Sequence, residues 1–425
     1  MKAPIPAMTG AKATAGEKPD FGVRIMALAD RLAAWSETPN GLTCTYLSPA
    51  HRAVAAELAS LMQDAGLATE IDAVGNVVGR YKSQSPGART LIVGSHYDTV
   101  RNAGKYDGRL GLLVGLVVAE HLVHRRIPLP YDLGLIGFSE EEGVRFSTSY
   151  IGSGAVAGRF DPALLDRRDA DGVSLAQALH AAGFDPQHIP ALARRAGDLA
   201  GYLEVHIEQG PVLLKADAPV GVVTAIAGNA RYLLTIDGEA GHAGTVPMPL
   251  RHDALAAAAE IVLLVERRCS QPGLVGTVGR FTVPDGTINM IAGRCEISLD
   301  IRSGDDATRK AASTDIFAEI DRIAARRGVR VTTTELLDAP AVPCSPRLQD
   351  AFAAAIKRAG LPLQKLPSGA GHDAVMFSDL TDFGMLFVRC GNGGVSHSPP
   401  ETVSAADADI AARILLDVLV NLKPD

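Results

Sequence analysis

Two short apolar runs that lead directly into charged residues constrain the fold of this chain most strongly. Leu91–Gly94 is followed by Ser95 and His96, and Leu133–Phe138 is followed by Ser139 and three glutamates. Apolar residues also recur at helical spacing over residues 23–35, 49–62 and 108–122. Strands that alternate with helices predict an α/β fold. In open sheets of this class, sites lie at the carboxyl ends of the strands.

The stretch from about residue 221 to residue 337 carries its own series of elements. Its pattern predicts a strand, a helix, two strands, a helix and a strand, which is the split ferredoxin-like order. A Pro-rich stretch around Pro340, Pro343 and Pro346 then marks the return to the first domain. We therefore expect one domain from residues 21–220 and 338–425, with residues 221–337 inserted into it. Residues 1–20, rich in Pro, Ala, Gly and Lys, are expected to form a flexible tail.

Composition excludes several classes of protein. The chain has 425 residues, of which 47% are hydrophobic and 21% are charged, as in folded globular proteins and unlike disordered ones. The net charge is −7, and Lys and Arg are scattered, so we expect no nucleic-acid partner. The longest apolar run, Leu112–Ala119, is far shorter than the ~20 residues of a membrane span, so we expect no membrane partner.

The five cysteines are far apart and include no CxxC pair. An odd, dispersed set of this kind does not form a disulfide framework and is typical of a reducing compartment. The first residues also lack the apolar segment of a signal peptide. We therefore expect a cytoplasmic protein.

A histidine and several carboxylates follow the two predicted strands. His96 and Asp107 stand near the end of the first, with Asp107 just before a predicted helix, and Glu142 follows the second. Such N and O ligands at neighbouring strand ends suit Zn²⁺ or Mn²⁺. Taken singly, each residue has another interpretation: a hydrogen-bonded histidine, an Asp-Gly turn, or a solvated helix start at Glu140–Glu142.

Two further histidines lie in distinctive contexts. The segment Leu203–Gly210 alternates, so Glu204, His206 and Glu208 are expected on one strand face, which is either solvent-exposed or lines a site. Near the C-terminus, a Gly-rich loop over residues 391–401 contains His397. Such a loop by itself is also typical of a simple turn.

Two other kinds of site fit the sequence poorly. Ser95, His96 and Asp98 have the side chains of a Ser-His-Asp triad, but sequence neighbours rarely form that geometry and no GxSxG elbow occurs. The Gly369-x-Gly371 pair is not a dinucleotide fingerprint, because Ala374 stands where the third glycine would be.

At this point the motifs resemble the di-metal amidohydrolases that include N-carbamoyl-amino acid hydrolases, β-ureidopropionases and allantoate amidohydrolases. These enzymes are related to the di-zinc aminoacylases and carboxypeptidases. The resemblance runs from about Arg24 to the end and is carried by GSHYDT at 94–99, EEGVRF at 141–146, HIEQG at 206–210, GHAGTVPM at 241–248 and GAGHD at 369–373. It implies a di-zinc-exopeptidase-like catalytic domain, with a mixed central sheet flanked by helices, and an inserted α+β ferredoxin-like dimerisation or lid domain.

The resemblance implies two divalent ions, Mn²⁺ or Zn²⁺, with Co²⁺ and Ni²⁺ also acceptable. The implied ligands are His96, Asp107, Glu142, His206 and His397. Asp107 would bridge the ions, with His96 and His206 on one and Glu142 and His397 on the other. Asp98 would orient His96, and Glu141 would be the general base. Adjacent side chains on an extended strand point apart, so Glu141 and Glu142 require an irregular backbone.

The resemblance also implies substrate contacts, at Gln209, His242, Asn289, Arg302, Gly371 and His372. His242 would stabilise the tetrahedral oxyanion, and Arg302 would hold the substrate carboxylate through a bidentate pair. Some of these groups would come from a partner subunit, which implies a homodimer. Without the resemblance, Arg302 is equally consistent with a surface ion pair and His242 with a turn residue.

The reaction implied is hydrolysis of a linear amide or amidine C–N bond on a small ureido carboxylate. Residues 35–46 and 102–111 are similar to the allantoate amidohydrolase branch, which implies release of ammonia and CO₂ from allantoate in purine catabolism. The alternative is an N-carbamoyl-L-amino acid hydrolase or β-ureidopropionase. Two further alternatives are an aminopeptidase, which the context of His206–Gln209 disfavours, and a catalytically silent metal-binding interaction module, which the complete ligand set disfavours.

Overall fold

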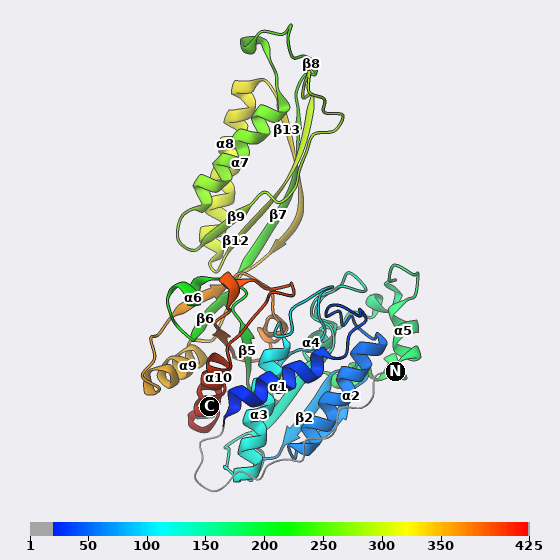
Figure 1. Cartoon of the computed structure of the whole chain (residues 1–425), viewed down its shortest axis with the longest axis vertical. Coiled ribbons are helices and arrows are strands. Elements are labelled where there is room, and N and C mark those ends of the chain that lie inside the picture. The colour runs from blue at the N-terminus through cyan, green and yellow to red at the C-terminus, as the bar shows by residue number, and fades with distance from the viewer. Residues whose placement is uncertain (1–19, 424–425) are drawn as a thin grey trace.

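The chain folds around two β-sheets that lie in separate parts of the molecule (Figure 1). The computed structural model describes residues 20–423. The tail predicted for residues 1–20 lies outside this range except for Asp20. The carboxylate of Asp20 accepts a hydrogen bond from the Val23 backbone N–H and caps the first helix.

The large sheet has nine strands and both parallel and antiparallel pairs. Its strands are β1 (Ala68–Ile71), β2 (Val77–Tyr81), β3 (Thr90–His96), β4 (Asp132–Phe138), β5 (Leu199–Ile207), β6 (Val220–Ile226), β14 (Val342–Pro343), β15 (Lys365–Ser368) and β16 (Phe383–Val388). They are ordered β1-β2-β4-β3-β5-β16-β6-β14, and β15 also pairs with β6. The central pairs β4–β3, β3–β5 and β5–β16 are parallel. The mixed central sheet predicted for this chain is therefore confirmed.

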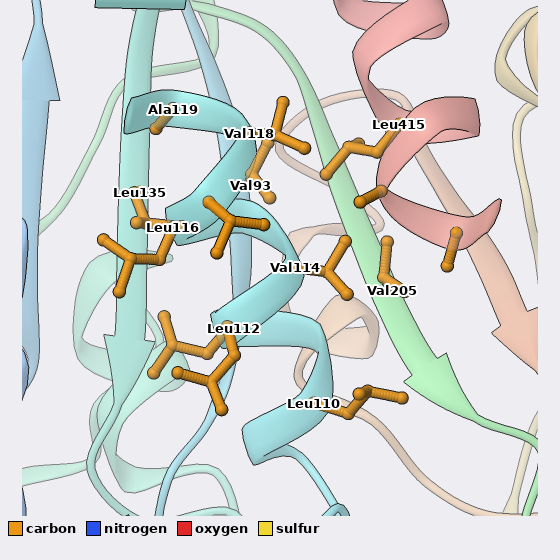
Figure 2. Close-up of a cluster of buried hydrophobic side chains, with 14 of the residues drawn as sticks. Val93, Leu110, Leu112, Val114, Leu116, Val118, Ala119, Leu135, Val205 and Leu415 are labelled. Carbon is orange, nitrogen blue, oxygen red and sulfur yellow. The ribbon is translucent and has the colours of Figure 1, made fainter. Parts of the chain in front are cut away.

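Helices surround the large sheet. They are α1 (Phe21–Ala33), α2 (Pro49–Asp64), α3 (Arg109–Arg125), α4 (Ile151–Val156), α5 (Leu175–Ala181), α6 (Val212–Lys215), α9 (Pro346–Arg358) and α10 (Ala405–Asn421). Figure 2 shows α3 packed against the strand residues Val93, Leu135 and Val205 and against Leu415 of α10. This apolar packing fixes the start of α3, where Asp107 lies, relative to the strand ends. In residues 20–423, no helix combines the length and apolar character that crossing a membrane requires.

The second sheet is antiparallel and has its own hydrophobic core. Its strands are β7 (Gly228–Asp237), β9 (Leu274–Thr277), β10 (Phe281–Thr282), β12 (Arg294–Ser303) and β13 (Arg330–Ala339), covered by α7 (Ala254–Cys269) and α8 (Asp306–Arg327). A small ribbon of β8 (Gly241–His242) and β11 (Met290–Ile291) extends from it. We call residues 228–339 the inserted unit. In Figure 1 this unit projects away from the large sheet, with β8 at its far end.

The chain crosses between the sheets later than predicted. The segment assigned from residue 221 to the inserted domain begins with β6, which pairs with β16 and β15 in the large sheet. Val220, Val222 and Val223 of β6 are fully buried in the large sheet. Burial of these apolar side chains explains why β6 belongs to the large sheet and not to the inserted unit. The crossings therefore lie next to Gly228 and after Ala339. The two crossing segments lie against each other, since a Cβ added to Gly228 would lie only 2.6 Å from the backbone nitrogen of Ala341.

Candidate metal centre and catalytic site

The predicted ligands converge where three parallel strands end. His96 ends β3, the glutamates follow β4, and His206 lies near the end of β5. Asp107 comes just before α3, and His397 lies in the loop before α10. A cavity of about 260 Å³ is lined by all five predicted ligands together with Glu141. The carboxyl edge of the sheet is therefore the candidate site.

Asp107 lies between two groups of these ligands. One carboxylate oxygen, Oδ1, is 3.4 Å from His206 Nε2, and the other, Oδ2, is 2.9 Å from His397 Nε2. The nitrogen of His397 is also 3.6 Å from Glu142 Oε1. The donor atoms of His96, Asp107 and His206 lie within 4.8 Å of one another, as do those of Asp107, Glu142 and His397. The arrangement allows one carboxylate to be shared by two cations.

Unpartnered polar atoms show that the site fits divalent metal ions. Among residues 20–423, no group hydrogen-bonds the buried His206 Nε2 or Glu142 Oε1. Burial raises the pKa of Glu142 to about 7, and the negative charge of Asp107 adds to this. A dication would satisfy both atoms and favour the ionised carboxylate. Imidazole nitrogens and carboxylate oxygens are ligands that Zn²⁺ and Mn²⁺ accept.

Asp98 connects the ends of β3 and β4. Its carboxylate accepts hydrogen bonds from the backbone N–H groups of Glu141, at 3.1 Å, and Glu142, at 3.2 Å. The same carboxylate lies 3.3 Å from His96 Nδ1. These contacts hold a bend at residues 141–142, followed by Gly143 with φ of +69°. This is the irregular backbone that the adjacent glutamates require, and both of their side chains line the cavity.

Glu141 is buried at the cavity wall. Burial raises the pKa of its carboxyl group well above the ordinary value, the His96 charge opposes this shift, and the Glu142 and Asp373 charges add to it. A raised pKa makes a carboxylate a stronger base, which suits it to accept a proton from water. The Tyr150 side chain also lines this wall.

Two residues that sequence reasoning did not single out support Asp107 from the C-terminal loop. Glu401 accepts hydrogen bonds from the backbone N–H groups of Tyr106, at 2.8 Å, and Asp107, at 3.2 Å. The Ser396 hydroxyl lies 2.8 Å from Glu401 Oε2 and 3.2 Å from Asp107 Oδ2. Their only sequence signal was membership of the loop around His397.

Glu204 supports the site from inside the sheet. It is fully buried, and its carboxylate accepts hydrogen bonds from the Ser95 hydroxyl at 3.2 Å, the Tyr202 hydroxyl at 3.0 Å and the Ala374 N–H at 3.1 Å. The polar strand face containing Glu204 and His206 is therefore not solvent-exposed.

Of the predicted substrate residues, Gln209 and Gly371 line the cavity and His372 does not. The Gln209 amide donates to both oxygens of Asp107, at 3.0 and 2.9 Å. His372 is buried, its Nε2 lies 2.7 Å from Ser368 Oγ, and its ring packs edge-on against His206 at 4.5 Å. In this structure His372 therefore lies behind His206, outside the lining of the cavity, and its predicted contact with substrate stays a prediction.

His242 and Asn289 lie at the far end of the inserted unit (Figure 1). Both are exposed, and His242 Nδ1 accepts a hydrogen bond from the Gly244 N–H at 3.0 Å. Neither side chain lines the cavity of its own chain. Their predicted contacts with substrate stay predictions that require a partner subunit.

Arg302 does not line the metal cavity itself, but it lines an adjoining cavity of about 760 Å³ that shares Gln209, Ala370 and His397 with it. Its Nε and Nη2 donate to the two oxygens of Asp300, at 2.8 and 3.0 Å. Its Nη1 donates to the Gly369 carbonyl at 2.7 Å. The predicted anchor for a substrate carboxylate is thus engaged with protein groups. Arg231, which faces Asp300 from the neighbouring strand β7, lines the metal cavity.

The fold and the site together define the class: an α/β enzyme whose histidines and carboxylates suit divalent metal ions. The chain belongs to the family described as Peptidase family M20/M25/M40, which it matches over residues 92–421. Because its similar proteins are amidohydrolases, it is a hydrolase of C–N bonds.

Similar proteins cover most of the chain. It is 42% identical to the N-carbamoyl-L-amino acid amidohydrolase of Geobacillus stearothermophilus over 84% of this chain and 88% of that protein. It is 39% identical to allantoate deiminase 1 of Glycine max, over 91% and 86% respectively. Among solved structures, a hydantoinase/carbamoylase family amidase from Burkholderia multivorans has a TM-score of 0.89 at 31% identity, over 95% of this chain and 98% of that one.

Gly108 gives a test of how the site is held. Its φ is +63°, and a Cβ there would lie 2.4 Å from the His96 ring. We expect Gly108→Ala to displace His96 and to weaken metal binding by about 10–100-fold, as disturbed support of a ligand does. Metal titration followed by calorimetry would measure this.

The matched control is Gly87→Ala. Gly87 has a similar φ of +69°, but a Cβ there would meet nothing within 4 Å. Both variants therefore carry the cost of an alanine at positive φ, and only Gly108→Ala carries the clash. Equal metal affinity in the two variants would contradict the prediction.

Proposed function

We propose that the protein is a metal-dependent amidohydrolase that cleaves a ureido C–N bond of a small carboxylate, with allantoate as the first candidate substrate. One observation carries the proposal: Asp107 lies between His206 and His397, with the Glu141 carboxylate on the wall of the same cavity. The names of the similar proteins support it, since allantoate and N-carbamoyl amino acids both join a ureido group to a carboxylate.

In this proposal, His96, Asp107, Glu142, His206 and His397 hold two divalent ions. Bound there, the ions supply positive charge that acidifies water and polarises the carbonyl under attack. Glu141 takes the proton from the attacking water and delivers it to the leaving nitrogen. Asp98 keeps Glu141 in place through its hydrogen bond with the backbone N–H. Gln209 keeps the Asp107 carboxylate oriented.

A homodimer is part of the proposal. His242 and Asn289 lie at the end of the inserted unit, away from the cavity of their own chain. Apolar side chains near them are strongly exposed: Met248 by 73% and Ile288 fully. Exposed apolar side chains that gather on one surface are typical of association sites. A second copy would cover them and could bring His242 to the cavity.

The proposal is tested by incubating the Mn²⁺-loaded protein with allantoate and with N-carbamoyl-L-amino acids in parallel. Ammonia released from allantoate, with little product from the carbamoyl compounds, is the expected result. Free amino acid from the carbamoyl compounds alone would make the protein a carbamoylase and retain the mechanism. If neither allantoate nor the carbamoyl compounds are hydrolysed, the proposed substrate class is overturned.

A further inference from the structure

We propose that the Tyr150 hydroxyl binds the second ureido group of allantoate, the group that does not react, and so makes the cavity prefer allantoate to N-carbamoyl amino acids. The inference rests on the proposed function for the reaction and its site. It identifies a determinant of specificity that the sequence motifs do not contain.

The metal cavity has few side chains that suit an uncharged polar group. Apart from the five predicted ligands and Glu141, the polar side chains among the described residues that line it are those of Ser149, Tyr150, Gln209 and Arg231. The Gln209 amide nitrogen is bonded to Asp107, and Arg231 is cationic. Ser149 and Tyr150 therefore offer the neutral hydroxyls of this lining. A hydroxyl both donates and accepts hydrogen bonds, as a ureido group does.

The chemistry of allantoate places its second ureido group near Glu141. One carbon of allantoate carries the carboxylate and both ureido groups. In the proposed reaction, Glu141 delivers a proton to the nitrogen that joins the reacting ureido group to this carbon. The second ureido group is attached to the same carbon, so it lies next to that nitrogen. A hydrogen-bond donor beside Glu141 can therefore reach its carbonyl oxygen.

The Tyr150 hydroxyl lies at this position. A Cβ added to Gly371 would lie 2.0 Å from the Tyr150 hydroxyl oxygen and 4.0 Å from Glu141 Oε1, so both oxygens lie over the same glycine. Burial, and next the Glu141 charge, raise the pKa of Tyr150 well above its ordinary value, so the hydroxyl keeps the proton that it donates. The Ser149 hydroxyl lies elsewhere, against Gly143, where an added Cβ would be 2.8 Å from it.

The backbone at Tyr150 is strained. Tyr150 is the N-cap of α4, and its φ of +64° and ψ of +29° lie in the left-handed region, which residues with a bulky side chain rarely adopt. N-cap residues are usually Ser, Thr, Asp or Asn, whose side chains accept a hydrogen bond from the start of the helix. The Tyr150 side chain makes no such bond and lines the cavity instead. Strained residues of this kind gather at functional sites.

Packing at the start of α4 holds this backbone. A Cβ on Gly152 would lie 2.3 Å from Asn76 Oδ1. The Asn76 amide donates to the Gly152 carbonyl at 3.1 Å, and its oxygen accepts a hydrogen bond from the Ser139 N–H at 3.0 Å. The start of α4 is thus fixed to the end of β4, from which Glu141 follows. Tyr150 and Glu141 are therefore held by the same part of the large sheet.

The test compares allantoate with N-carbamoylglycine, which has a hydrogen where allantoate has its second ureido group. For Mn²⁺-loaded Tyr150→Phe we expect kcat/KM for allantoate to fall about 10-fold, the effect of one lost hydrogen bond, and kcat/KM for N-carbamoylglycine to stay unchanged. The loss should appear in KM, with kcat retained, because the bound group does not react. A structural role of Tyr150, or a role at Glu141, would instead lower kcat for both substrates.

Tyr46→Phe is the matched control. Tyr46 is buried, and its hydroxyl donates to the Val74 carbonyl at 2.8 Å. It packs in the same hydrophobic cluster as Ile151, the first residue of α4, but it does not line the metal cavity. We expect its kinetics with both substrates to equal those of the wild type. An unchanged ratio of the two kcat/KM values in Tyr150→Phe, an equal loss for both substrates, or a wild type that prefers N-carbamoylglycine overturns the inference.

Direct binding separates this inference from the proposed function. Calorimetry measures binding of allantoate and of N-carbamoylglycine to Glu141→Gln, with and without Tyr150→Phe. If the wild type hydrolyses neither compound, the proposed function fails, and a selective loss of allantoate affinity in Tyr150→Phe still supports the site for the second ureido group. If Tyr150→Phe binds allantoate as tightly as its parent, or if no allantoate binds to either protein, the inference is overturned.

Discussion

Glu141→Gln is expected to lower kcat by about 10²–10⁴-fold, the contribution of a positioned general base, and to leave the metal content unchanged. The amide fills the same space and still accepts hydrogen bonds, but it cannot take a proton from water. The Asp98 contact to Glu141 is made by the backbone N–H, so it survives the substitution. Single-turnover kinetics and elemental analysis of the purified variant measure the two halves of this prediction.

Glu140→Gln supplies a matched control one residue away. Glu140 is buried, and burial raises the pKa of its carboxyl group well above the ordinary value, yet it does not line the cavity. A neutral amide there resembles the protonated carboxyl group. We expect turnover close to that of the wild type. A Glu141→Gln enzyme that turned over as fast as Glu140→Gln would remove Glu141 from its role as the base.

Asp107→Ala is expected to reduce bound metal from about two ions per chain to well below one, because one shared carboxylate completes both ligand groups. The variant also removes the partner of His397, whose pKa the hydrogen bond with Asp107 raises to about 9. Turnover should fall with the metal content. Elemental analysis after dialysis against Mn²⁺ or Zn²⁺ measures the loss.

Wild-type protein from which a chelator has removed the metal is the comparison for Asp107→Ala. A ligand that binds only the folded state stabilises it by about 2.7 kcal/mol at one hundred times its Kd. Metal should therefore raise the thermal midpoint of the wild type, and it should not raise that of the variant. A variant that still gains stability from metal, with two ions bound, would show that Asp107 is not the shared ligand.

Local sequence patterns were enough to predict the elements that carry the site. His96 and the glutamates follow apolar runs that predict strands, as β3 and β4 confirm, and the start of α3 follows Asp107. Strand ends and residue types are local properties. Parallel pairing then brings those ends together without any further information from distant residues.

The sequence by itself therefore determined the α/β class and the strand edge where the predicted ligands meet, while the full set of five ligands was implied by the resemblance to a family and stays a prediction. Only the tertiary structure decided which sheet takes β6, because its apolar run fits either one until burial is known. The same holds for the support of Asp107 by Glu401, a contact across 294 residues. It holds also for the hydrogen bond of Arg231 to Asp300 across the strand pair and for that of Arg302 to the Gly369 carbonyl, just after β15 of the large sheet. The groups that a side chain contacts are decided by packing between residues far apart in the chain.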